Sequence, residues 1–171
     1  MLDLLYSRRS IRKYTDQSVE NEKIERLIEA ALLSPTSRNR EAWEFVVVTD
    51  KTALKQLSTS KPGSAAMLVE APLAIVVCGN PQDSDVWVED CSIAAIIIQL
   101  AAHDLGLGSC WIQLRGRMYD EKKSSSEYVK ESLKLPAHLE VECIISLGYP
   151  AEIKKQRNKS ELSYNKIIHR S

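Results

Sequence analysis

The residues best suited to chemistry in this sequence are cationic side chains near its start. Four of the six residues from Arg8 to Lys13 are basic. In an extended backbone Arg8, Ser10 and Arg12 point to the same side, and in a helix the two arginines lie one turn apart. Converging guanidinium groups beside a serine hydroxyl suit a phosphate monoester, because each charge-assisted hydrogen bond contributes roughly 1.5–3 kcal/mol. A solvated basic turn that pairs with surface carboxylates is an equally good interpretation of this motif alone.

A second basic segment lies near the end of the chain. If the backbone after residue 151 is extended, Lys155, Arg157 and Lys159 point to one side. The 23 basic and 23 acidic residues of the chain cancel, so two basic clusters in a neutral protein suggest that the clusters meet. The alternative is a solvated basic tail.

A third segment with hydrogen-bonding side chains runs from Ser34 to Trp43, between a predicted helix and a predicted strand. It could present Thr36, Ser37 and Asn39 to a polar ligand. A plain connector between the helix and the strand explains the same composition, and these residues by themselves favour the connector.

These segments need structural elements to position them, and the most prominent is an apolar stretch in the middle of the chain. Eleven of the fifteen residues from Cys91 to Leu105 are apolar, and the polar Ser92, Gln99 and His103 share one face. The stretch predicts a helix that is buried over most of its circumference and that ends at Gly106. It is too short and too polar to cross a bilayer. In a small domain such a helix needs other elements on every side, or a second subunit.

The remaining pattern alternates helices with strands. We predict helices at 2–7, 22–33, 51–58 and 124–133, a helical turn at 65–70, and strands at 44–49, 73–79, 109–114 and 140–147. The strand at 73–79 is almost continuously apolar, which predicts helices on both faces of the sheet.

Composition argues against several classes of function. A chain of 171 residues predicts one domain, and its zero net charge gives no general attraction to nucleic acid or to a membrane surface. The cysteines and histidines lack metal-binding spacing, so we predict no metal site. Without an export signal, a reduced, cytoplasmic setting is expected. The glycine-rich run after the central helix enters a strand, whereas a dinucleotide-binding fingerprint opens a helix.

Four blocks in series resemble the FMN-dependent nitroreductase family: RRSIRKYT, SPTSRNREAW, EDCSIAAIIIQLAAHDLGLGSCWI and ISLGYPAEIKKQR. The resemblance covers nearly the whole chain. It implies an α+β fold, a three-layer α/β/α arrangement with a largely antiparallel mixed sheet. It also implies a homodimer that holds FMN at the subunit interface. The single domain would cover 1–171, with 151–171 as a C-terminal extension that packs on the partner subunit.

The resemblance further implies a set of cofactor-binding residues, matched by position. They are Arg8, Arg9, Ser10, Arg12, Pro35, Thr36, Ser37, Asn39, Gln113, Leu114, Lys155 and Arg157. The first four would take the phosphate, the ribityl chain and the pyrimidine edge of the flavin, and the last two would close over the phosphate. The residues from Pro35 to Asn39 would reach FMN from the other subunit. The backbone N–H groups of Gln113 and Leu114 would face flavin N5 and O4. No catalytic side chain is implied.

The function that follows from the resemblance is hydride transfer from NADH or NADPH, through flavin N5, to a nitroaromatic, quinone or similar small-molecule acceptor. The alternative is a flavin-binding or flavin-handling protein of the same fold without reductase turnover. A nucleic-acid-binding module that uses the basic clusters is disfavoured by the zero net charge. The acceptor, the NADH or NADPH preference and the redox potential are not fixed by these residues.

Three departures from the family pattern bear on the site. The 40–43 segment lacks the usual Gln and Pro before Trp43, and Gln156 stands where the tail usually has proline. The connection at 115–123 is short where larger members insert a helical lid, which implies a more open site. Arg115 and Arg117 could contact an anionic substrate or the nicotinamide cofactor, although a solvated loop is the stronger interpretation.

Overall fold

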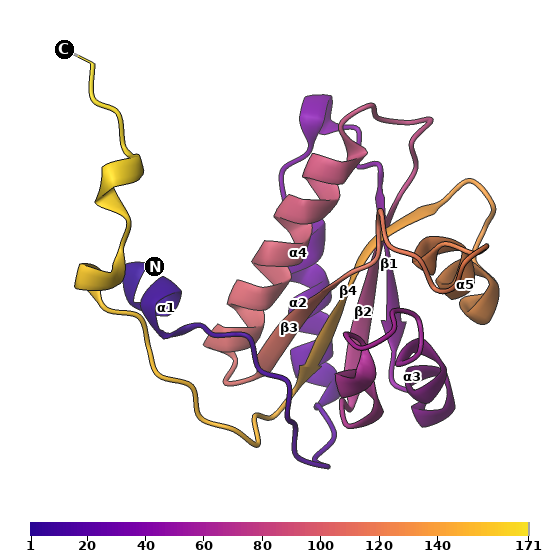
Figure 1. The fold of residues 1–171 in the computed structure, drawn as a ribbon, viewed down its shortest axis with the longest axis horizontal. Helices are drawn as coiled ribbons and strands as arrows, with labels where there is room; N and C mark the ends of the chain where they lie inside the picture. Colours follow the sequence, from indigo (N-terminus) through magenta and orange to yellow (C-terminus); the bar gives the residue numbers. More distant parts are fainter. Residues whose placement is uncertain (171) are drawn as a thin grey trace.

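A four-stranded sheet forms the middle layer of the computed structural model, which describes residues 1–170 (Figure 1). Its strands are β1 (Trp43–Val48), β2 (Leu73–Gly79), β3 (Gly108–Gln113) and β4 (Glu140–Gly148). They lie in the order β1-β2-β4-β3, and each neighbouring pair is antiparallel. A parallel bridge joins Ser10 to Ser109 at the β3 edge. The expected α+β class with a largely antiparallel sheet is confirmed.

Helices cover both faces of this sheet. Every residue of β2 is buried, and so is every residue of β4 after Glu140, because each central strand is covered on two sides. The helices α2 (Asn21–Leu32) and α4 (Trp87–Asp104) pack on one face. The other face carries α3 (Lys51–Leu57), the 3₁₀ turn η2 (Ala66–Val69) and α5 (Ser125–Leu133). The three-layer α/β/α prediction is therefore confirmed.

The helix α4 spans eighteen residues and is the longest element. Ala94, Ala95 and Ile98 are fully buried against the sheet. Ile93 and Ile96 keep 39 % and 37 % of their surface exposed, so within this chain the helix is buried on one side and not over most of its circumference. An apolar strip on α4 is left without a cover from residues 1–170. No helix within residues 1–170 combines the length and the apolar character needed to cross a membrane.

The two ends of the chain run together at one side of the layered body, next to the end of α4 (Figure 1). The helix α1 (Leu2–Ser7) lies beside the tail, residues 151–170, in which the Arg157 N–H donates to the Tyr6 carbonyl at 3.0 Å. The tail holds two short 3₁₀ turns, η3 (Lys159–Glu161) and η4 (Tyr164–Lys166), and none of its described residues is buried. The body thus gives the tail little cover.

Candidate functional site

Residues 8–14, the N-terminal arm, are docked along the open edge of β3. The Ile11 N–H donates to the Ser109 carbonyl at 2.9 Å, and the Tyr14 hydroxyl donates to the Ile11 carbonyl at 2.7 Å. Ile11 and Tyr14 are both buried. A Cβ on Gly108 would lie 2.8 Å from the Ile11 side chain, so this glycine is what lets the arm approach the strand. The arm is therefore part of the folded body.

The basic residues of the arm lie close to the basic residues of the tail. The Arg9 guanidinium donates to the Lys155 carbonyl. Burial, followed by the neighbouring Arg157 charge, lowers the pKa of Arg8. Arginine stays protonated in proteins, so this direction marks a positive charge whose surroundings do not compensate it. We call Arg8, Arg9, Lys155 and Arg157 the cationic cluster; the expectation that the two ends of the chain meet is confirmed.

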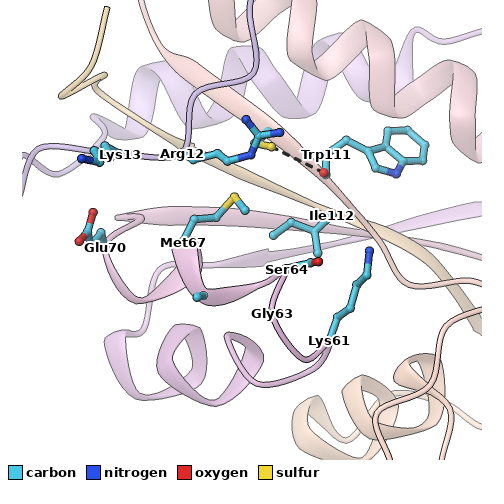
Figure 2. Close-up of a pocket in the computed structure, with 11 residues that line it drawn as sticks. Arg12, Lys13, Lys61, Gly63, Ser64, Met67, Glu70, Trp111 and Ile112 are labelled. Carbon is cyan, nitrogen blue, oxygen red and sulfur yellow. Dashed lines mark hydrogen bonds between the residues drawn. The ribbon is translucent and has the colours of Figure 1, made fainter.

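Beside the arm lies a cavity of ≈ 570 Å³ between β3 and the segment 61–70 (Figure 2). It is lined by Arg12, Lys13, Lys61, Gly63, Ser64, Ala66, Met67, Glu70, Cys110, Trp111 and Ile112. Figure 2 shows the Lys61 side chain extending toward Ile112, with Arg12 on the opposite side of the opening. Cations at the rim and the apolar Met67 and Ile112 in the wall suit a flat, partly apolar ligand that carries negative charge.

Arg12 lines this cavity directly, and Ser10 hydrogen-bonds to the thiol of Cys110, another residue of the lining. Burial raises the pKa of the Cys110 thiol, and Arg12, Ser10 and Arg8 act in the opposite direction. The thiol donates to the Trp111 carbonyl at 3.6 Å, the contact drawn in Figure 2. The cationic arm and the cavity wall are thus one continuous surface.

The open edge of β3 presents backbone groups to this surface. The N–H groups of Leu114 and Arg115 both donate to the Glu142 carbonyl, at 3.2 Å and 3.0 Å. Successive N–H groups alternate between the two sides of an antiparallel strand, so the Gln113 N–H points away from β4, toward the open edge. The expected role of Gln113 toward a flavin stays a prediction. Leu114 does not present its N–H as expected, because that group is donated to Glu142 and the side chain is fully buried.

The 34–43 loop is held at the start of α4. The Ser37 N–H donates to Asp90 Oδ1 at 2.9 Å, in the first turn of α4. At the other end of α4, Ser7 Oγ, just before the arm, lies 2.7 Å from His103 Nε2. Asp90 and His103 are thirteen positions apart, or about 20 Å at the α-helical rise. The four expected loop residues, Pro35, Thr36, Ser37 and Asn39, do not line the cavity of their own chain.

This loop is held in an unusual backbone conformation. Arg38, Asn39 and Glu41 have φ angles of 54°, 53° and 49°, a region that costs a non-glycine residue on the order of 1–3 kcal/mol. The Glu41 N–H donates to Thr36 Oγ1 at 3.1 Å, and Arg40 donates to the Asp83 carbonyl at 2.8 Å. A plain connector would not need this strain, so the loop is built to present its backbone in one shape.

Several residues that line the cavity were not predicted from the sequence. Lys61, Gly63, Ser64 and Met67 belong to a segment that reads as a turn followed by a helical turn. Nothing local distinguishes this lysine from a solvated one, because its role depends on the packing of η2 beside β3. Only the fold brings it opposite Arg12.

The connection at 115–123 is short and pinned to α5. Tyr119 stacks on Tyr128 with ring centroids 3.9 Å apart, and Lys123 pairs with Glu131 at 2.6 Å. Arg117 is exposed, and the connection supplies none of the residues that line the cavity. It covers no part of this opening.

Comparison with known proteins agrees with this geometry. The model of the nitroreductase family matches residues 5–61 and 54–149. A putative NADH dehydrogenase/NAD(P)H nitroreductase of Archaeoglobus fulgidus is 40 % identical over 157 residues, which is 90 % of this chain and 87 % of the relative. The chain belongs to the nitroreductase family.

Solved structures extend the similarity to the backbone. An FMN-dependent nitroreductase from Clostridium difficile R20291 superposes with a TM-score of 0.98 at 50 % identity, covering 100 % of this chain and 99 % of that one. A putative NADH dehydrogenase/NAD(P)H nitroreductase from Parabacteroides distasonis gives 0.89 at 38 % identity, with 99 % and 97 % covered. The tail and the arm therefore lie within the similarity, since the first comparison covers the whole chain.

Proposed function

We propose that this protein is an FMN-dependent oxidoreductase that takes a hydride from NADH or NADPH and passes it to a nitroaromatic, quinone or similar acceptor. The observation that carries the proposal is the cavity beside β3, which has an apolar wall rimmed by Arg12 and Lys61, with the Arg8 charge acting on the Cys110 thiol in that wall. FMN pairs a phosphate with a flat, largely apolar ring, and this surface offers a fitting group for each part. When bound, the flavin would supply the hydride-transfer chemistry.

The residues of the chain would bind and orient that group. The cationic cluster would hold the phosphate by charge-assisted hydrogen bonds, because the charges of Arg9 and Arg157 act on Arg8, and Lys155, paired with Glu161 at 3.7 Å, lies beside them. Arg12 would place a positive charge at the pyrimidine edge, which favours the form that carries negative charge after reduction. The Gln113 N–H at the open edge of β3 would donate to the ring.

We further propose a homodimer with one site at each end of its interface. Three features support it: the exposed Ile93 and Ile96 on α4, the tail without cover from its own body, and the strained 34–43 loop, which does not line the cavity of its own chain. A second chain packed on α4 would cover the two exposed isoleucines. It would also bury the tail as a C-terminal extension and receive the 34–43 loop at its own cavity. The single domain would then span residues 1–171, and the four free cysteines suit a reduced, cytoplasmic setting.

An absorption spectrum of the purified protein tests the proposal. We expect flavin bands that bleach under anaerobic conditions on addition of NADH or NADPH and return when an acceptor is added. A protein that is colourless and takes up no added FMN would contradict the proposal.

The second candidate is a flavin-binding protein of the same fold without reductase turnover. The short 115–123 connection, which supplies no side chain to the cavity, is the observation that favours it. It predicts a yellow protein whose flavin bands do not bleach with either nicotinamide nucleotide. The same spectrum therefore separates the two candidates.

A further inference from the structure

Glu142 is a charged residue in a central, almost fully buried strand of the protein. Its exposed fraction is 3 %, and it lies within β4, where its neighbours Val141 and Cys143 are fully packed core residues. Burying a carboxylate is costly unless polar partners compensate it, so its presence at this position needs an explanation. Burial also raises the pKa of Glu142, against the opposing effects of Gln113 and Arg115.

A β-bulge places this side chain. In the β2–β4 pairing, Val77 faces Cys143 and Cys78 faces Val141, which leaves Glu142 as the extra residue. Val141 packs in the core on the α5 side and Cys143 in the core on the α4 side. A bulge of this kind re-aims a side chain that regular alternation would send elsewhere.

The backbone of Glu142 fastens the end of β3. Its carbonyl oxygen accepts from the N–H groups of Leu114 and Arg115, at 3.2 Å and 3.0 Å, and lies 3.4 Å from Gln113 Nε2. The chain then turns, with the Arg117 N–H donating to the Leu114 carbonyl at 2.9 Å. The last residue of β3, Gln113, is the one whose own N–H faces the open edge.

The carboxylate of Glu142 continues this fastening through side chains. Gln113 Nε2 donates to Glu142 Oε1 at 3.3 Å and to the Arg115 carbonyl at 3.1 Å. With its nitrogen held in this way, the Gln113 amide turns its oxygen toward Trp111, whose Nε1–H donates to it at 2.9 Å. The result is a series of hydrogen bonds, here called the relay, from the Glu142 carboxylate through the Gln113 amide to the Trp111 indole. Trp111 also lines the cavity.

Charged groups on the neighbouring elements leave the carboxylate only partly paired. Arg115 Nε lies 3.9 Å from Oε2, too far for a hydrogen bond, and the Arg115 side chain is 54 % exposed. Glu89 of α4 acts on it as a like charge. Among residues 1–170, Oε2 is buried with no hydrogen-bond partner. The directed contact of this carboxylate is therefore the one with Gln113.

We propose that Glu142 is a positioning residue for the flavin site: through the Gln113 amide it fixes Trp111, which lines the cavity, and the end of β3 that follows it. The proposal rests on the proposed function, because it assigns that edge of β3 to a flavin. It adds a residue that does not touch the cavity and that no periodicity in the sequence marks.

Four variants test it. Glu142→Leu removes the acceptor, Glu142→Gln keeps an oxygen for the Gln113 amide without the charge, and Gln113→Leu cuts the relay at its middle. Glu140→Gln is the matched control, since it removes a carboxylate from the same strand that pairs with Lys130 and Ser126 instead. The first readout is the indole N–H resonance of Trp111, assigned by its loss in Trp111→Phe and followed in FMN-free protein. The second is the Kd for FMN.

We expect Glu142→Leu and Gln113→Leu to shift the Trp111 indole resonance, to speed its exchange with solvent, and to weaken FMN binding by about tenfold, the scale of one buried hydrogen bond to a charged group. Glu142→Gln should restore both readouts toward wild type, and Glu140→Gln should leave both unchanged. If Glu142→Leu fails to fold, Gln113→Leu carries the test.

Two results would overturn the proposal. One is a Trp111 resonance and a Kd for FMN that are unchanged in Gln113→Leu and Glu142→Leu. The other is a Glu142→Gln protein as impaired as Glu142→Leu, which would assign the effect to charge and not to the hydrogen bond. A wild-type protein that binds no FMN would contradict the proposed function instead, and the indole resonance would still report on the relay.

Discussion

The two basic segments of the chain are held in opposite ways. The arm carries Arg8 and Arg12 and is docked on β3 through Ile11 and Tyr14, both buried. The tail carries Lys155 and Arg157 and has no buried residue between 151 and 170. Both segments reach the same cationic cluster, yet only the arm is fixed there by the core of its own chain.

The arm is therefore a preformed part of the proposed site, whereas the tail becomes ordered there only when another surface covers it. Side chains on an ordered segment lose little freedom when a ligand arrives, whereas a loosely held tail must be ordered at that moment. The arm should therefore account for most of the affinity for an anion in any state of the protein. The contribution of the tail should depend on whatever surface covers it.

The largest expected effect is from the arm. Replacing both Arg8 and Arg12 by alanine should lower FMN affinity by a factor of about 10² to 10⁴, from two charge-assisted hydrogen-bonding groups of roughly 1.5–3 kcal/mol each. Circular dichroism should show a folded protein, and flavin titration gives the Kd. A double variant that binds FMN as tightly as wild type would show that these arginines do not hold the phosphate.

The matched change in the tail should have a smaller effect. Replacing Lys155 and Arg157 by alanine should weaken FMN binding by about tenfold, because exposed charges contribute on the order of 0–1 kcal/mol each. Lys159→Ala with Lys166→Ala is the control, since it removes two exposed charges from the same tail. A loss as large as that of the arm variant would mean that the tail is as firmly ordered as the arm.

The contact between the arm and β3 can be loosened without removing a charge. Gly108→Ala places a Cβ 2.8 Å from Ile11, so we expect a loss of about 1–3 kcal/mol in the free energy of unfolding together with weaker FMN binding. Gly106→Ala is the control: its φ of +78° makes any Cβ unfavourable by about 1 kcal/mol, but nothing lies within 4 Å. Equal FMN affinity in the two variants would disconnect arm docking from ligand binding.

The smallest expected effect is a pH dependence at the base of the arm. Burial, followed by the Arg8 charge, lowers the pKa of His103, whose Nε2 contacts Ser7 Oγ at 2.7 Å. The unfolded chain therefore binds a proton at His103 more readily than the folded chain. The contribution of neutral His103 to the free energy of unfolding is present above pH about 6.5 and is lost as the pH falls below it. Chemical denaturation between pH 8 and 5 should show a smaller loss in His103→Asn than in His138→Asn. Identical pH profiles for the two variants would show that His103 does not stabilise the start of the arm.

Much of the fold could be predicted from local pattern. The strand at 73–79 and the helix after Cys91 are continuous apolar runs, and their elements are found where expected. The arginines of residues 8–12 were recognisable because cations that share one side of a short segment suit an anion in either backbone conformation. These inferences depend on neighbours in the chain, which the sequence displays directly.

Other features depended on contacts between distant residues. The engagement of the Leu114 N–H follows from the register of β3 against β4, and the exposure of Ile93 and Ile96 follows from which side of α4 the sheet covers. Lys61 resembles any turn lysine until η2 is packed beside β3. Periodicity gives the face of a helix or strand, but not its partner or its register.

The sequence by itself determined the alternation of helices and strands, the family, and which side chains are candidates to bind an anion, because each is written in residue types and short spacings. Only the tertiary structure decided which of these groups meet. It docked the arm through Gly108, turned Glu142 inward at a bulge, and fastened the 34–43 loop to the first turn of α4. The physical reason is that burial, register and convergence belong to pairs of residues far apart in the chain, and a pattern along one segment does not specify such pairs.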